Sequence, residues 1–227
     1  MKRADTADLA GSVAVGALAA FALLALTVTG RGGSPLFGDE DLLEWSVGHR
    51  PPAMVAVARA VTFTGTGVVP YVLAALAGLL AGRTPRQRGP AVAAALLCLA
   101  AGQAVRYGVM SLVARPRPAH RDWVTHASGW AFPSGHTTTA AIAAGLLALA
   151  ILARARRGGA ALVTLVLTWG ALVGLTRVYL GVHWFSDVLG GWLFALCWLS
   201  LCVYTAARLA RARRPAEPSG PARQPQG

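Results

Sequence analysis

The chain has 227 residues, of which 55% are hydrophobic and only 13% are charged. With a mean hydropathy of +0.53, this composition excludes an ordinary soluble domain and indicates an integral membrane protein. The formal net charge of +12 would suit nucleic-acid binding if the basic residues covered one face, but most of them lie in short clusters beside apolar runs. We therefore expect the partner to be a lipid bilayer and not a nucleic acid.

Six membrane spans can be drawn, because a spanning helix needs about 20 apolar residues. The first is expected from Leu9 to Thr29, and a polar loop from Arg31 to Pro52 follows it. The second is interrupted, since Ala53 to Gly67 contains Arg59 and a TFTGTG breaker before the apolar run Val68 to Leu80. Part of this second span could therefore lie along the membrane interface.

The other four spans are expected from Ala91 to about Val113, from about Thr137 to Ala153, from Ala160 to Leu175, and from Val188 to Ala207. The predicted fold class is thus all-α, a six-transmembrane-helix bundle. We expect one membrane domain over residues 1–207 and a basic, disordered cytoplasmic tail over residues 208–227, which are rich in Pro, Gly and Arg.

Basic residues in the short connecting segments predict the orientation, because cytoplasmic loops carry an excess of Lys and Arg. With six spans, four basic clusters fall on one side, which predicts that both termini are cytoplasmic. The segment from Arg115 to Pro133 falls on the opposite side, so topology does not explain its arginines. The four clusters are Lys2 and Arg3; Arg83, Arg86 and Arg88; Arg154, Arg156 and Arg157; and Arg208, Arg211, Arg213 and Arg214.

Three separated segments reach the outer surface under this topology. They are ARPRP at the end of the third span, PSGH at residues 133–136, and TRVYLGVHWFSD at residues 176–187. Arginine forks bind phosphate oxygens through paired hydrogen bonds and stay charged. A helix that begins at Ser134 and Gly135 would present free N–H groups to an anion. These segments together are suited to bind a phosphate group.

The third segment also contains a candidate nucleophile. His183 and Asp187 are four residues apart, so one helical turn could bring the carboxylate to one imidazole nitrogen. That contact would fix the tautomer and leave the other nitrogen free to attack phosphorus.

These segments resemble the three-part signature of the type 2 phosphatidic acid phosphatase (PAP2) superfamily, in its membrane-bound lipid phosphatase branch. The signature is usually written as KxxxxxxRP, then PSGH, then a segment with SR, His and Asp. The second part is intact at residues 133–136, and the third is present as Thr176, Arg177, His183 and Asp187, with threonine in place of the usual serine. The resemblance extends over residues 106–187, and the order of the motifs fits as well.

The resemblance implies dephosphorylation of a lipid phosphate or diphosphate at the outer face, without a metal or other cofactor. His183 would form a phosphohistidine, Asp187 would orient it, and His136 would act as general acid and then base. The substrate could be phosphatidic acid, phosphatidylglycerol phosphate or undecaprenyl diphosphate. The groups expected to hold the phosphate oxygens are Arg117, Ser134, Gly135 and Arg177, with Arg115 as a further candidate.

One position departs from the family pattern, because the expected lysine of the first motif falls on Met110. The nearest cation is Arg106, one helical turn earlier. An arginine inside a span is costly unless it faces a polar cavity, which favours a role for Arg106 at the phosphate. Helical side chains lean toward the N-terminus, which opposes it. Either Arg106 takes over the contact or the site has one cation fewer.

Other interpretations remain open at this point. The chain could be a non-catalytic binder or carrier of lipid phosphates, or a transferase that passes the phosphoryl group to another acceptor. A zinc site of His136, His183 and Asp187 is disfavoured by the neighbouring arginines. Each residue also has a structural alternative, with arginines as interface anchors, His136 or Asp187 as a helix cap, and His183 in an interfacial aromatic cluster.

Overall fold

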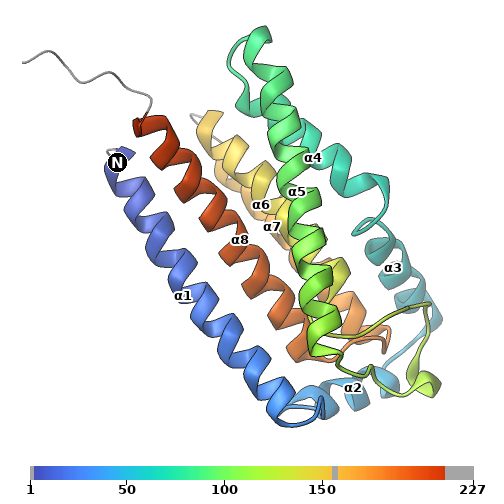
Figure 1. Ribbon diagram of the computed structural model, residues 1–227. Coiled ribbons are helices and arrows are strands. Elements are labelled where there is room, and N and C mark those ends of the chain that lie inside the picture. Colours follow the sequence, from blue (N-terminus) through green and yellow to red (C-terminus); the bar gives the residue numbers. More distant parts are fainter. Residues whose placement is uncertain (1–2, 155–157, 213–227) are drawn as a thin grey trace, which may run out of the picture.

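The structure is a computed structural model that describes residues 3–154 and 158–212. Over these ranges it is all-helical and contains no strand, which confirms the predicted fold class (Figure 1). The elements are α1 (Arg3–Gly30), α2 (Asp39–Gly48), α3 (Pro52–Phe63), α4 (Val68–Ala81), α5 (Pro85–Val113), the short 3-10 helix η1 (His120–Asp122), α6 (Gly135–Arg154), α7 (Gly159–Tyr179) and α8 (Phe185–Ala212).

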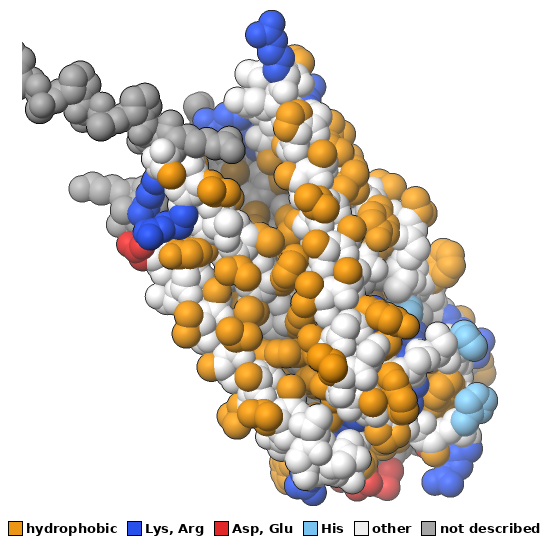
Figure 2. Space-filling view, viewed as in Figure 1, with side chains coloured by type: hydrophobic (Ala, Val, Ile, Leu, Met, Phe, Trp, Pro, Cys, Tyr) orange, Lys and Arg blue, Asp and Glu red, His pale blue; other side chains and the backbone are white. Residues whose placement is uncertain are grey.

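Five helices, α1, α5, α6, α7 and α8, are long and apolar enough to cross a membrane. Helices α3 and α4 pass the same test as a pair and are bent by 51° at their break, so they count as a sixth span if the bent pair crosses as one. The break lies at residues 64–67, inside the TFTGTG segment. Large apolar side chains cover much of the outer surface (Figure 2), and Leu112, for example, is 86% exposed. A bilayer is the solvent that such a surface requires.

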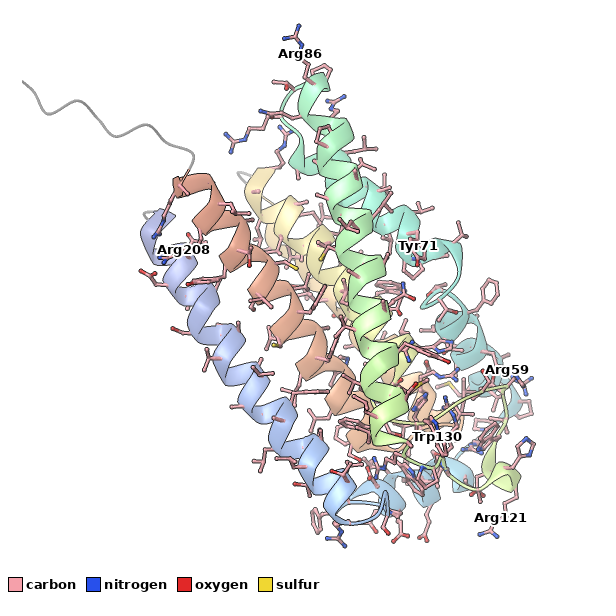
Figure 3. The ribbon with its side chains drawn as sticks, viewed as in Figure 1. Arg59, Tyr71, Arg86, Arg121, Trp130 and Arg208 are labelled. Atoms are coloured by element: carbon pink, nitrogen blue, oxygen red, sulfur yellow. The ribbon has the colours of Figure 1, made fainter. Side chains whose placement is uncertain are left out.

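The bundle has two distinct ends (Figure 1). The start of α1 and the end of α8 lie at one end, together with the turn between α4 and α5. Helix α2, η1 and the loop before α6 lie at the other. Arg86 and Arg208 mark the first end, whereas Arg121 and Trp130 mark the second (Figure 3).

Helix α6 lies at the centre of the bundle and contacts α4, α5, α7 and α8. Small residues allow these helices to approach closely. A Cβ atom added to Gly191 of α8 would lie 2.9 Å from Cβ of Thr137 in α6. A Cβ atom added to Gly174 of α7 would lie 3.0 Å from Cγ2 of the same threonine. The first turn of α6 is therefore held between α7 and α8, which positions the PSGH segment.

The bounds of several helices differ from those of the predicted spans and loops. The expected polar loop from Arg31 to Pro52 contains helix α2, whose first turn carries three acidic residues that interact favourably with the helix dipole. Helices α6, α7 and α8 extend into polar sequence beyond the apolar runs, and α8 continues to Ala212, past the predicted boundary at 207. Residues 213–227 of the predicted tail lie outside the described residues, as do Lys2, Arg156, Arg157, Arg213 and Arg214.

Candidate active site

A cavity of about 420 Å³ lies at the end of the bundle that is remote from the start of α1. Its walls come from α5, α6, α7, the loop before α6, the segment before α8, and the break between α3 and α4. Among the described residues that line it, none is acidic. The cationic and imidazole side chains in the lining are Arg106, Arg117, His126, His136, Arg177 and His183.

The chain returns to the cavity directly after α5 because the helix cannot continue. Ala114 adopts a left-handed conformation with φ of 48°, and prolines at positions 116 and 118 lack the N–H that a helix needs. The carbonyl of Arg115 then accepts a hydrogen bond from the Ala131 N–H at 2.9 Å, which closes the base of the loop. Arg117 is carried back over the cavity by this turn.

Arg117 is fixed by backbone carbonyl groups on one side and by a histidine on the other. Its Nε and Nη2 donate to carbonyl oxygens of residues 128–130 at 2.8 to 3.0 Å. Its Nη1 donates to the Val182 carbonyl at 2.8 Å and lies 2.8 Å from Nε2 of His183. The predicted phosphate ligand and the predicted nucleophile are thus in direct contact.

His183 lies just before α8 and is only 1% exposed. Its Nδ1 lies 3.4 Å from Oδ2 of Asp187, which also accepts the Trp184 N–H at 2.9 Å. Because Nε2 faces a guanidinium donor, we assign the proton of the neutral imidazole to Nδ1. Burial and then the nearby Arg117 and Arg177 charges lower the pKa of His183 well below its usual value. The imidazole is therefore neutral near pH 7, with a lone pair on Nε2.

Arg177 and Arg106 bring two further guanidinium groups to the cavity. Nη1 of Arg177 donates to Thr62 Oγ1 at 3.2 Å, and Nη1 of Arg106 donates to the sulfur of Met110 at 3.1 Å. In both side chains Nε is buried and has no hydrogen-bond partner among the described residues. A buried cationic donor left unpaired is costly, which points to an anionic ligand.

Arg106 reaches the predicted phosphate site despite the lean of helical side chains. It bends toward the C-terminal end of α5, since it contacts Met110 one turn later. A Cβ atom on Gly135 would lie 3.4 Å from Cζ of Arg106. The guanidinium therefore stands beside the N-terminus of α6, where an anion is favoured.

The PSGH segment divides between the cavity and the core. Helix α6 begins at Gly135, as predicted, and both Gly135 and His136 line the cavity. Ser134 does not line it: the residue is completely buried, and its hydroxyl accepts a hydrogen bond from Thr137 Oγ1 at 2.9 Å. Ser134 N–H donates to the Asp187 carbonyl at 3.1 Å, so this residue joins α6 to α8.

Arg115, only two residues before Arg117, has a different environment. It is completely buried and does not line the cavity. Its Nη1 donates to Oδ1 of Asp187 at 2.6 Å and its Nη2 donates to Oδ2 of Asp39 at 2.9 Å. Asp39 was not predicted from the sequence, because nothing in its spacing distinguishes it from the neighbouring acidic residues Glu40 and Asp41.

The fold and the site define a multi-pass helical membrane protein with a cationic cavity at one end of the bundle. Residues 91–211 match the model of the PAP2 superfamily. This match covers more than half of the chain, so the chain belongs to the PAP2 superfamily. Membership places it among the hydrolases that act on phosphate esters.

Two similar proteins come from Bacillus subtilis strain 168. The undecaprenyl-diphosphatase BcrC is 34% identical over 140 residues, which cover 60% of this chain and 67% of that protein. Phosphatidylglycerophosphatase B is 36% identical over 90 residues, which cover 37% of this chain and 42% of that protein.

A solved structure has a similar fold. It is the crystal structure of a transmembrane PAP2-type phosphatidylglycerolphosphate phosphatase from Bacillus subtilis, with a TM-score of 0.68 and 22% sequence identity. The superposition covers 88% of this chain and 96% of the other. The two chains therefore share the arrangement of helices over nearly their whole length.

Proposed function

We propose that this protein hydrolyses a lipid phosphate or diphosphate at the extracytoplasmic face of the membrane, through a phosphohistidine on His183. One observation carries the proposal: three arginine side chains surround one cavity with no acid among its described lining residues, next to an imidazole whose other nitrogen faces Asp187. The names of both similar proteins, an undecaprenyl-diphosphatase and a phosphatidylglycerophosphatase, indicate substrates that are lipids with terminal phosphate groups.

In the first step, Nε2 of His183 attacks phosphorus, a P–N bond forms and the bond to the leaving oxygen breaks. His136 donates a proton to that oxygen, and the bound phosphate anion, which offsets the charges of the surrounding arginines, would allow His136 to carry this proton. The imidazole ring of His183 gains positive charge, which Asp187 stabilises from the other nitrogen. Nη1 of Arg117 lies 2.8 Å from Nε2, so an approaching phosphate would have to take over this donor with one of its oxygens and thereby free the Nε2 lone pair for attack.

In the second step, His136 takes a proton from water, the water oxygen attacks phosphorus, and the P–N bond breaks. Phosphate leaves, and both histidines return to their starting states. Charge develops on the equatorial oxygens in both steps, where Arg117, Arg177 and the Gly135 N–H would stabilise it. Ser134 supports the N-terminal turn of α6 in this scheme.

Arg106 supplies the cation that the family pattern places at Met110. Its guanidinium lies in the same cavity, beside Gly135. Its buried Nε lacks a partner among the described residues. A phosphate oxygen at this position would satisfy that donor and shield Arg106 from the like charges of Arg117 and Arg177.

The outer location of the site rests on charge. The end of the bundle opposite the cavity carries the basic residues of the short connections, in agreement with the positive-inside rule. All six crossings would then form one membrane domain with both termini in the cytoplasm. The residues at that end are Arg83, Arg86, Arg88, Arg154, Arg208 and Arg211.

The test of activity is phosphate release by the purified protein in detergent micelles that contain a chelator. Undecaprenyl diphosphate, phosphatidylglycerol phosphate and phosphatidic acid would be compared as substrates, and radiolabelled phosphate would be trapped on the protein by rapid denaturation. The expected result is acid-labile label on a histidine and release of phosphate to water. Binding without release would identify a carrier, and transfer to an added alcohol without hydrolysis would identify a transferase.

The test of orientation uses single cysteines in a variant that lacks the three native cysteines. The first cysteine replaces Arg121 at the cavity end, whose side chain is 87% exposed. The second replaces Gln87 at the opposite end of the bundle. An impermeant thiol reagent added to intact cells should label the first and not the second. The reverse pattern would place the cavity in the cytoplasm and contradict the proposed substrate leaflet.

A further inference from the structure

Behind His183, on the side away from the cavity, lies a buried cluster of three charged side chains, Asp39, Arg115 and Asp187. Arg115 is 0% exposed, Asp187 is 0% exposed and Asp39 is 1% exposed. The three come from α2, from the turn after α5 and from the first turn of α8. Only Asp39 lies outside the segments that the sequence singled out.

Every nitrogen of the Arg115 guanidinium already has a partner. In addition to the two carboxylates, Nη1 donates to Ser186 Oγ at 2.7 Å, while Nε and Nη2 donate to the carbonyls of Gly33 and Ser34 at 3.2 and 3.1 Å. Arg115 is thus paired with two carboxylates and does not line the cavity, which corrects its prediction as a phosphate ligand. It is a link between two acids.

Asp39 is also saturated, and all of its partners belong to the back of the site. Oδ1 accepts the N–H of Ser186 at 2.8 Å. Oδ2 accepts the hydroxyl of Ser186 at 2.6 Å, the N–H of Leu36 at 2.8 Å and the guanidinium of Arg115. Two hydrogen bonds therefore connect Asp39 of α2 to Ser186, the residue directly before Asp187. Arg115 adds a second connection, because it forms ion pairs with both Asp39 and Asp187.

The charges of this cluster explain why a second acid is needed. If Arg115 faced Asp187 alone, the pair would be neutral, and Asp187 would stabilise a positive imidazole only weakly. Asp39 offsets the charge of Arg115, so the cluster of two carboxylates and one guanidinium carries a net charge of about −1. His183 becomes positive when it is phosphorylated, and at low dielectric a net negative cluster behind it lowers that barrier.

We propose that Asp39 is a positioning residue for the nucleophile, which acts through Arg115 and Ser186 to hold Asp187 in place and to leave its negative charge available to His183. This inference rests on the proposed phosphohistidine mechanism. It also assigns a role in catalysis to α2, a helix that contributes nothing to the cavity lining.

The test is the Asp39→Asn variant of the full-length protein in micelles, with Asp41→Asn as the matched control. The control makes the same chemical change two residues later on the same helix, at an exposed position. Three quantities are measured: kcat, the rate of phosphoenzyme formation, and the inhibition constant of inorganic phosphate. The last reports on the cavity itself, which Asp39 does not touch.

We expect Asp39→Asn to lower kcat and the rate of phosphoenzyme formation by about 10- to 100-fold, which is less than the loss of a direct partner of a catalytic histidine causes. The inhibition constant of phosphate should stay within about twofold, and Asp41→Asn should behave like the wild type. An unchanged kcat in Asp39→Asn would overturn the proposal. So would a loss of phosphate binding in parallel with kcat, because that result indicates a merely structural role.

A second variant separates charge from packing. Adding Arg115→Gln to Asp39→Asn removes one positive and one negative charge, so Asp187 again faces His183 with its charge unshared. The double variant should therefore recover about three- to tenfold in the rate of phosphoenzyme formation over the single variant. A structural role predicts the opposite order. If the wild type itself releases no phosphate, the proposed function fails. If the wild type and Asp39→Asn are equally active, only the proposed role of Asp39 fails.

Discussion

The two sides of His183 use the same residue type in opposite ways. In front, Arg106, Arg117 and Arg177 surround a cavity whose described lining residues include no acid. Nε of Arg106 and Nε of Arg177 have no hydrogen-bond partner in the part of the chain that the structure describes. Behind, Arg115 is held by two carboxylates, whereas the partners of Arg117 in front are carbonyl oxygens and His183. Within this site, arginine charge is left without a carboxylate partner only on the cavity side of His183. A bound anion would supply the balancing negative charge there.

The largest expected effect is at the boundary between the two sides. His183→Ala should lower phosphate release by at least about 10,000-fold and abolish the trapped phosphoenzyme, because among the described histidines of the lining only His183 is paired with a carboxylate. The retention of inorganic phosphate binding serves as the control for an intact cavity. Label trapped on another residue in this variant would contradict the role of His183.

Arg115 and Arg106 should differ in what their removal does to stability. Arg115→Met leaves two buried carboxylates without their shared cation and should destabilise the protein by about 3 to 5 kcal/mol. Arg106→Met removes a cation that has no acidic partner and should leave the unfolding temperature unchanged or raise it. Thermal unfolding in the same detergent measures both, and equal losses would remove the distinction between the two sides.

Arg177 should be sensitive even to a change that keeps its charge. Arg177→Lys loses the planar fork that can bind two phosphate oxygens, so we expect kcat/KM to fall by about 100-fold. Arg86→Lys, the same change at the opposite end of the bundle (Figure 3), is the control and should be silent. A fully active Arg177→Lys variant would show that a point charge is sufficient there.

Arg106→Ala should have a smaller effect, a fall of about tenfold in kcat/KM, because Arg117 and Arg177 remain. Adding Met110→Lys to this variant restores a cation at the position of the family motif and should recover much of the loss. If Arg106→Ala is silent in an active enzyme, the site works with fewer cations, and the assignment of Arg106 is incorrect.

The smallest expected effect is that of pH on the protonation state of His183, which should not change in the range where histidine usually titrates. Because the pKa of His183 lies well below its usual value, its ring stays neutral as the pH falls through about 6.5, where an ordinary histidine takes up a proton. In a histidine-labelled sample, the ring resonance that is lost in His183→Ala should not move between about pH 8 and pH 5.5. A titration midpoint near 6.5 would mean that burial and the charges of Arg117 and Arg177 do not lower the pKa of His183.

Local sequence was sufficient for the crossings and for most of the cavity. Apolar runs about 20 residues long predict membrane helices because the bilayer leaves no alternative way to satisfy the backbone. The motif order brought His183, Asp187, His136, Arg117 and Arg177 to one end, and the structure places all of them in or directly behind one site. Ser134 and Arg115 lie at the same end, but neither of them lines the cavity.

What only the tertiary structure decided is the difference between residues that the sequence makes look alike. Arg115 and Arg117 share one RPRP segment, and Asp39 and Asp41 share one acidic turn, yet one member of each pair is buried in the cluster behind His183. Such an outcome depends on which partners are brought close by helices distant in sequence, here α2 against α8. The spacing of motifs and apolar runs in the sequence determines which end of the bundle a side chain reaches. Whether that side chain faces the cavity or the buried cluster depends on the free energy of pairing a buried charge.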